Sequence, residues 1–264
     1  MPLREVNEVR LLVEESGSGD PLVLVHGSWD DRRVWALIED DLARRFRVVS
    51  YDRRGHTGSA DSAEPGSRRD DEDDLAAVIE ALGLAPAHVV ANSFGASIAL
   101  GLVARQPQLF RTVCAHEPPL VSLVADDQAV EAFGEAVPPV LDLIGRGEPE
   151  AAAREFVEIV LGPGAWEMMP EGERATMVAN ANTFAGEALD PAWADIDLHA
   201  LSEVSVPVLL TQGDQSPPMF AKVIARLAPA MGSAEVETLP GAGHVPHATH
   251  PAEYVAVISR FATS

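Results

Sequence analysis

The sequence has 264 residues, 47% of them hydrophobic, which suits one large α/β domain or a core with an inserted subdomain. Its formal net charge of −22 opposes binding to nucleic acids and to anionic membranes, so we expect neither as a partner. A single cysteine, Cys114, excludes an internal disulfide bond.

Two features of the sequence bear on its location. The N-terminal residues 1–5 lack the basic start and apolar stretch that mark a secretory signal. No apolar run approaches the roughly 20 residues that a membrane-spanning helix needs. We therefore expect a cytoplasmic protein.

The first part of the chain alternates between predicted strands and predicted helices. Continuous apolar runs are typical of strands buried on both faces, and apolar residues at helical spacing predict amphipathic helices. The predicted elements are paired edge strands over 4–15, a strand over 21–25, a helix over 32–45, a strand over 47–52, a helix over 70–83, a strand from residue 88 with a helix after it, and a strand over 112–117.

Residues 120–200 interrupt this alternation, since they show helical patterns such as 151–161 but no clear buried strand. Strands alternating with helices predict an α/β fold whose mostly parallel sheet carries helices on both faces. We therefore predict a core formed by 1–119 and 201–264, with a helical cap over 120–200. The later core elements are a strand over 206–211, a helix over 218–228, a strand over 235–239 and a helix over 251–262.

An acidic run over 70–74 opens one predicted helix. Five acids in a row raise the question of a metal site. Carboxylates also interact favourably with the positive end of a helix dipole, and we expect these side chains to do so while remaining solvated. We accordingly predict no metal here.

Polar residues follow many of the predicted strands, and in parallel sheets functional groups gather at the carboxyl ends of the strands. Ser93 lies among them in Ala-x-Ser-x-Gly, between a predicted strand and a predicted helix. A sharp turn there would present the serine hydroxyl, although an ordinary strand-to-helix turn is the alternative. The polar residues at strand ends are His26, Asp52, Ser93, Glu117, Asp214 and His244.

A serine nucleophile needs a base, and the base needs an acid to orient it. His244 is the preferred base because it follows a late predicted strand within Gly-x-Gly-His. Glu117 and Asp214 are the two candidate acids, and each also fits a structural role in a loop or turn.

The motifs His26-Gly27, Asp52-Arg53-Arg54-Gly55, Ser93 in its turn and Gly243-His244 together resemble the α/β-hydrolase superfamily across almost the whole chain. In most members the acid ends a Gly-x-x-Asp segment, but the corresponding residue here is Ser216, and Asp214 lies two residues earlier. The segment Cys114–Pro119 resembles zearalenone-type lactone hydrolases, in which a glutamate at this position is the acid. The resemblance favours Glu117 over Asp214.

The oxyanion formed during ester cleavage requires backbone N–H donors. We expect these from Phe94 and Ser28, with Gly27 as the alternative to Ser28. Five apolar residues are candidates for a substrate pocket. For the four that lie in the insert, packing within its own core is the alternative. The candidates are Trp29, Trp166, Met168, Met169 and Phe184.

The sequence therefore predicts a cofactor-independent serine hydrolase that cleaves a small-molecule carboxylic ester or lactone. Ser93 is the expected nucleophile, His244 the base and Glu117 the acid. Two alternatives stay open: a cofactor-free perhydrolase or cyclase on the same fold, and a non-catalytic ligand-binding homologue.

Overall fold

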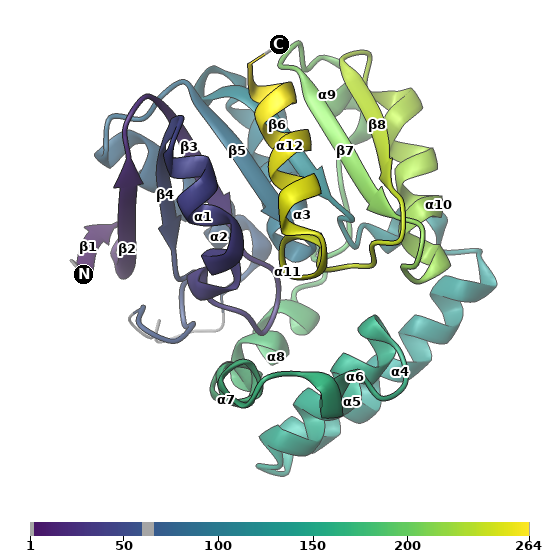
Figure 1. Cartoon of the computed structure of the whole chain (residues 1–264). Coiled ribbons are helices and arrows are strands. Elements are labelled where there is room, and N and C mark those ends of the chain that lie inside the picture. The colour runs from purple at the N-terminus through teal and green to yellow at the C-terminus, as the bar shows by residue number, and fades with distance from the viewer. Residues whose placement is uncertain (1–2, 60–65, 264) are drawn as a thin grey trace.

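The computed structural model describes residues 3–59 and 66–263. Its strands form an eight-stranded sheet in the order β1-β2-β4-β3-β5-β6-β7-β8 (Figure 1). β2 pairs antiparallel with β1 and β4, and every other pairing in the sheet is parallel. The strands are β1 (Leu3–Val6), β2 (Val9–Gly17), β3 (Asp20–Val25), β4 (Phe46–Tyr51), β5 (Ala87–Asn92), β6 (Phe110–His116), β7 (Val208–Gly213) and β8 (Ala234–Leu239).

Helices cover both faces of the sheet, which confirms the predicted fold class (Figure 1). Successive side chains of β3 point to opposite faces, so Leu22 and Leu24 pack with one group of helices and Val23 and Val25 with the other. The first group is α1 (Ala36–Ala43), α11 (Pro246–Thr249) and α12 (Pro251–Ala262); the second is α2 (Arg68–Ala81), α3 (Phe94–Arg105), α9 (Leu198–Ser202) and α10 (Pro218–Leu227). Short 3₁₀ helices are η1 (Arg32–Trp35), η2 (Pro107–Leu109), η3 (Val121–Val124) and η4 (Ala228–Ala230).

Five of the helices between β6 and β7 form a cap beyond the carboxyl ends of the parallel strands (Figure 1). Their apolar side chains form a separate core that includes Val157 and Phe184. The next helix, α9, crosses the predicted boundary at residue 200, and its Leu201 is buried in the core of the sheet domain. The cap helices are α4 (Gln128–Gly145), α5 (Pro149–Leu161), α6 (Ala165–Met168), α7 (Glu171–Ala179) and α8 (Ala181–Leu189). Among the described residues, no helix is long and apolar enough to cross a membrane.

The acidic run differs from its prediction. α2 begins with a capping box in which Ser67 and Asp70 bond each other's backbone N–H groups. Three of the acids are buried and paired with arginines, so the expectation that the whole run stays solvated is wrong. The pairs are Asp71 with Arg53, Glu72 with Arg105 and Asp74 with Arg54.

Candidate active site

Ser93 lies at the sharp turn between β5 and α3. Its backbone has φ 55° and ψ −124°, a conformation that side chains other than glycine rarely adopt. Gly95 allows the turn to approach the neighbouring strand, because a Cβ atom there would lie 2.4 Å from the Val25 carbonyl oxygen. The turn has the geometry expected of a nucleophile elbow.

His244 lies across the strand ends from Ser93, and its Nδ1 is 2.7 Å from Oε2 of Glu117. Phe220 stacks on the imidazole with ring centroids 4.4 Å apart, and Asn92 donates a hydrogen bond to the His244 carbonyl. Because Nδ1–H donates to the carboxylate, Nε2 is the nitrogen available to accept a proton. Ser93 and His244 line the same cavities.

Glu117 directly follows β6 and is fully buried, with a left-handed φ of 47°. Its second oxygen, Oε1, accepts a hydrogen bond from the Gly213 N–H at 2.7 Å. Burial raises the pKa of Glu117, but the hydrogen bond from His244 and the attraction to its imidazolium form bring the pKa below its ordinary value. The carboxylate is therefore ionised at neutral pH.

Asp214 is exposed and is engaged elsewhere. Its Oδ1 accepts hydrogen bonds from the Gly241 N–H at 2.8 Å and from the Gln215 side chain at 3.0 Å. These bonds fix the turn after β7 to the loop that precedes His244. Of the two carboxylates considered from the sequence, the structure thus brings Glu117 to the imidazole and leaves Asp214 in a turn.

One group of possible metal ligands among the described residues consists of His116, Glu117 and His244. Both oxygens of Glu117 already accept hydrogen bonds, from His244 and from the Gly213 amide. Burial lowers the pKa of His116 to about 4, so this imidazole is neutral, and its Nδ1 lies 2.9 Å from Thr211 Oγ1. These contacts favour a hydrogen-bonded histidine–carboxylate pair at this place.

The two candidate oxyanion donors, Ser28 and Phe94, line the same cavity as Ser93. Phe94 is the first residue of α3, so its N–H has no partner within the helix. Gly27 packs closely on the elbow, since a Cβ atom there would lie 3.1 Å from Ser93 Cβ. The arrangement suits a donor pair beside the nucleophile.

Arg53, which the sequence analysis named only as part of a motif, contacts both segments that carry the candidate oxyanion donors. Its guanidinium lies 4.9 Å from the centre of the Phe94 ring and donates to the Gly27 carbonyl at 3.0 Å. It also pairs with Asp71 at 2.9 Å and with Glu187 of α8 at 2.6 Å. Arg53 therefore ties the elbow, the loop after β3 and the cap together.

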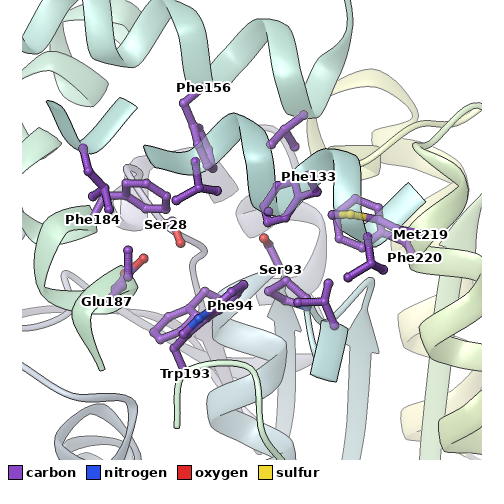
Figure 2. A pocket seen from close by; sticks show the side chains of 18 of the residues that line it. Ser28, Ser93, Phe94, Phe133, Phe156, Phe184, Glu187, Trp193, Met219 and Phe220 are labelled. Atoms are coloured by element: carbon purple, nitrogen blue, oxygen red, sulfur yellow. The ribbon is translucent and has the colours of Figure 1, made fainter. Parts of the chain in front are cut away.

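Two cavities meet at Ser93 and His244. One, of about 330 Å³, is mostly apolar and lies under the cap (Figure 2). The other, of about 590 Å³, also contains the carboxyl groups of Asp30 and Glu173. Five residues line both: Ser28, Ser93, Phe156, Val160 and His244. Ser93 and His244 therefore lie where the two cavities meet.

Three predicted pocket residues lie elsewhere. Trp29 is fully buried and stacks on Phe156, Trp166 packs in the cap core, and Met168 is 81% exposed. None of them lines either cavity at Ser93, which corrects the prediction for all three, whereas Met169 lines the larger cavity. Lining residues that the sequence analysis did not identify include Phe133, Phe156, Glu187, Met219 and Phe220.

Asp30 gives a pH-dependent prediction. Burial, followed by the charges of Asp31 and Glu173, raises its pKa from 3.8 to about 7. The pKa of Asp30 is higher in the folded protein than in the unfolded chain. Its ionisation therefore lowers the free energy of unfolding as pH rises from about 4 to about 7, and the loss stays constant above pH 7. Calorimetry should show Asp30→Asn with a higher Tm than the wild type at pH 8 and an equal Tm at pH 4. An equal gain at both pH values would contradict this.

Residues 22–257 match the alpha/beta hydrolase family. The chain is 28% identical to a 2-(acetamidomethylene)succinate hydrolase from Mesorhizobium japonicum, covering 97% of this chain and 93% of that protein. It is 26% identical to a pimeloyl-[acyl-carrier protein] methyl ester esterase from Nitrosospira multiformis, covering 97% and 100%. The crystal structure of an alpha/beta hydrolase from Sphaerobacter thermophilus matches with a TM-score of 0.78 and 27% identity, covering 98% and 100%. The chain therefore belongs to the alpha/beta hydrolase family.

Proposed function

We propose that this hydrolase cleaves a carboxylic ester or lactone through an acyl-enzyme. The observation that carries the proposal is the buried 2.7 Å contact between His244 Nδ1 and Glu117 Oε2, in a cavity shared with Ser93 on its strained turn. A serine with a carboxylate-oriented imidazole is the arrangement that acyl transfer needs. The Nitrosospira multiformis relative, named as a methyl ester esterase, supports an ester substrate.

In the proposed reaction, Ser93 Oγ attacks the carbonyl carbon while His244 Nε2 takes the hydroxyl proton. Glu117 stabilises the resulting imidazolium, and the N–H groups of Phe94 and Ser28 stabilise the oxyanion. The tetrahedral intermediate then expels the alcohol, which takes the proton from His244. A water molecule, deprotonated by His244, releases the acid and restores Ser93.

The substrate is expected to be of small-molecule size and largely apolar. Cavities of about 330 and 590 Å³ lie within the range of small-molecule sites. A lactone with apolar segments on both sides of its carbonyl would occupy both cavities and would remain attached as a single acyl chain after ring opening.

A fluorophosphonate probe tests the proposal directly, because it reacts with activated serines. We expect one label per chain, located at Ser93 by peptide mass spectrometry, and loss of p-nitrophenyl butyrate hydrolysis in proportion to labelling. His244→Ala should label far more slowly. Hydrolysis that persists after full labelling, or no label at Ser93, would overturn the proposal and favour a non-catalytic or differently catalysed role.

A further inference from the structure

Glu187 is a buried carboxylate that the proposed reaction does not use. It lies on α8 of the cap, is 4% exposed, and lines the cavity that contains Ser93 and His244 (Figure 2). Its Oε1 accepts a hydrogen bond from Arg53 at 2.6 Å, and the Ser28 hydroxyl also stabilises the charged carboxylate. Oε2 has no hydrogen-bond partner within 3–59 and 66–263. A buried carboxylate oxygen left without a donor is costly, and a ligand can supply that donor.

The charges around Glu187 do not balance. Arg53 is shared between Glu187 and Asp71, so one guanidinium faces two buried carboxylates. His56 lies 4.0 Å from Glu187, but burial and the charge of Arg53 hold the pKa of His56 well below its ordinary value, so it adds no positive charge at neutral pH. Burial raises the pKa of Glu187, and the charge of Arg53 opposes that rise. A hydrogen-bond donor that reaches Oε2 would stabilise the carboxylate further, whereas an anion there would be disfavoured.

The surroundings limit the kind of ligand that fits. Figure 2 shows Ser28 and Glu187 close together at one end of the cavity, beside Phe184, with Ser93 facing the same space. Most of the remaining lining is apolar and includes Val121, Phe133, Val137, Leu141, Met219 and Phe220. A molecule that fills this cavity thus meets Ser28 and Glu187 at one end, apart from Ser93 and His244, in an otherwise mostly apolar wall.

We infer that Glu187 is a specificity-determining residue whose free oxygen accepts a hydrogen bond from a hydroxyl or N–H group on an otherwise apolar substrate. The inference rests on the proposed function, because the reacting carbonyl must lie at Ser93. It names the substrate class more closely as hydroxy- or amido-substituted apolar esters and lactones. Esters that carry a carboxylate in this cavity are poor substrates.

Three kinds of p-nitrophenyl ester of matched length test this assignment: the hexanoate, its hydroxy-substituted forms and the monoester of adipic acid. A second set consists of butyrate esters whose alkyl alcohols carry the same groups, assayed by the acid released, so that the groups are offered to either cavity. We expect kcat/KM of the wild type to be about tenfold higher for the best hydroxy ester than for its apolar parent, as a hydrogen bond to a charged group implies. The carboxylate ester should be the slowest.

Glu187→Gln is the informative variant. The amide oxygen keeps the hydrogen bond from Arg53 and turns an NH₂ donor toward the cavity. The preference for the hydroxy ester should therefore disappear, and kcat/KM for the carboxylate ester should rise. Asp71→Asn is the matched control, since it removes a carboxylate from the same arginine but does not line this cavity. It should lower the Tm and leave the ester preference unchanged.

The outcomes separate the two proposals. A wild type that hydrolyses the hexanoate but ranks the hydroxy ester no higher overturns the assignment of Glu187, and this result does not depend on any variant folding. Equal changes for all esters in Glu187→Gln, or the same loss of preference in Asp71→Asn, overturn it as well. No hydrolysis of any ester together with no label at Ser93 instead refutes the proposed function.

Discussion

Glu117→Gln is expected to lower kcat about 10⁴-fold while changing KM little, as for an amide that replaces a triad carboxylate. The Gly213 N–H will hold the amide oxygen in the place of Oε1, so the NH₂ group faces His244 Nδ1. The imidazole must then carry its proton on Nε2, the nitrogen that has to accept the serine proton. Stopped-flow release of p-nitrophenol from p-nitrophenyl butyrate measures the loss.

Asp214→Asn is the control for that experiment. Its carboxylate bonds the Gly241 N–H and not the imidazole, so kcat should remain within about twofold of the wild type. Adding Ser216→Asp to Glu117→Gln should restore part of the activity, because a carboxylate at the position usual for the family would again face the histidine. Full activity in Glu117→Gln with collapse in Asp214→Asn would reverse the assignment.

Ser93→Ala is expected to lower kcat by about 10⁶-fold, the loss typical of removing a serine nucleophile. The remaining rate above the uncatalysed reaction would come from the oxyanion donors and from binding. The same assay measures it, with active-site titration to exclude contamination by wild-type enzyme. A loss of less than about 100-fold would show that another group attacks the ester.

Ser93→Gly separates catalysis from backbone strain. Alanine keeps the Cβ atom that makes φ 55° unfavourable, whereas glycine adopts this conformation readily. Both variants should be inactive, but Ser93→Gly should unfold at a higher temperature than Ser93→Ala. A lower Tm for Ser93→Gly would show that the turn stores little strain in the native protein.

Much of the fold was predictable because its signals are local. Apolar runs such as 21–25 identify buried strands, and the spacing of Trp35, Ile38 and Leu42 identifies a helix face, without knowledge of distant contacts. The alternation of strands and helices predicts a parallel sheet. Ser93 and His244 each follow the carboxyl end of a strand, and these ends lie at one edge of a parallel sheet, so the two residues meet there. The interrupted alternation likewise indicated helices between β6 and β7.

The burial of charged groups was not predictable in this way. Asp71 and Arg53 are 18 positions apart, and Glu187 lies 134 positions from Arg53, so their buried pairing depends on how α2 and the cap pack on the sheet. A run of acids at the start of a helix looks the same in the sequence in both cases: when water solvates the carboxylates and when an arginine from a distant segment pairs with them. The cap residues follow the same logic, because the packing of the cap helices brings Phe156 to the cavity and leaves Met168 exposed.

The sequence alone determined the secondary structure, the family resemblance and a short set of candidate catalytic residues, since these depend on patterns within a few residues. Only the tertiary structure decided which carboxylate faces His244. Glu117 and Asp214 follow adjacent strands, and a left-handed φ at Glu117 with its bond to the Gly213 N–H brings that carboxylate to the imidazole. Side-chain direction in loops depends on backbone dihedral angles and on partners far away in the chain, and neither is visible in local residue spacing.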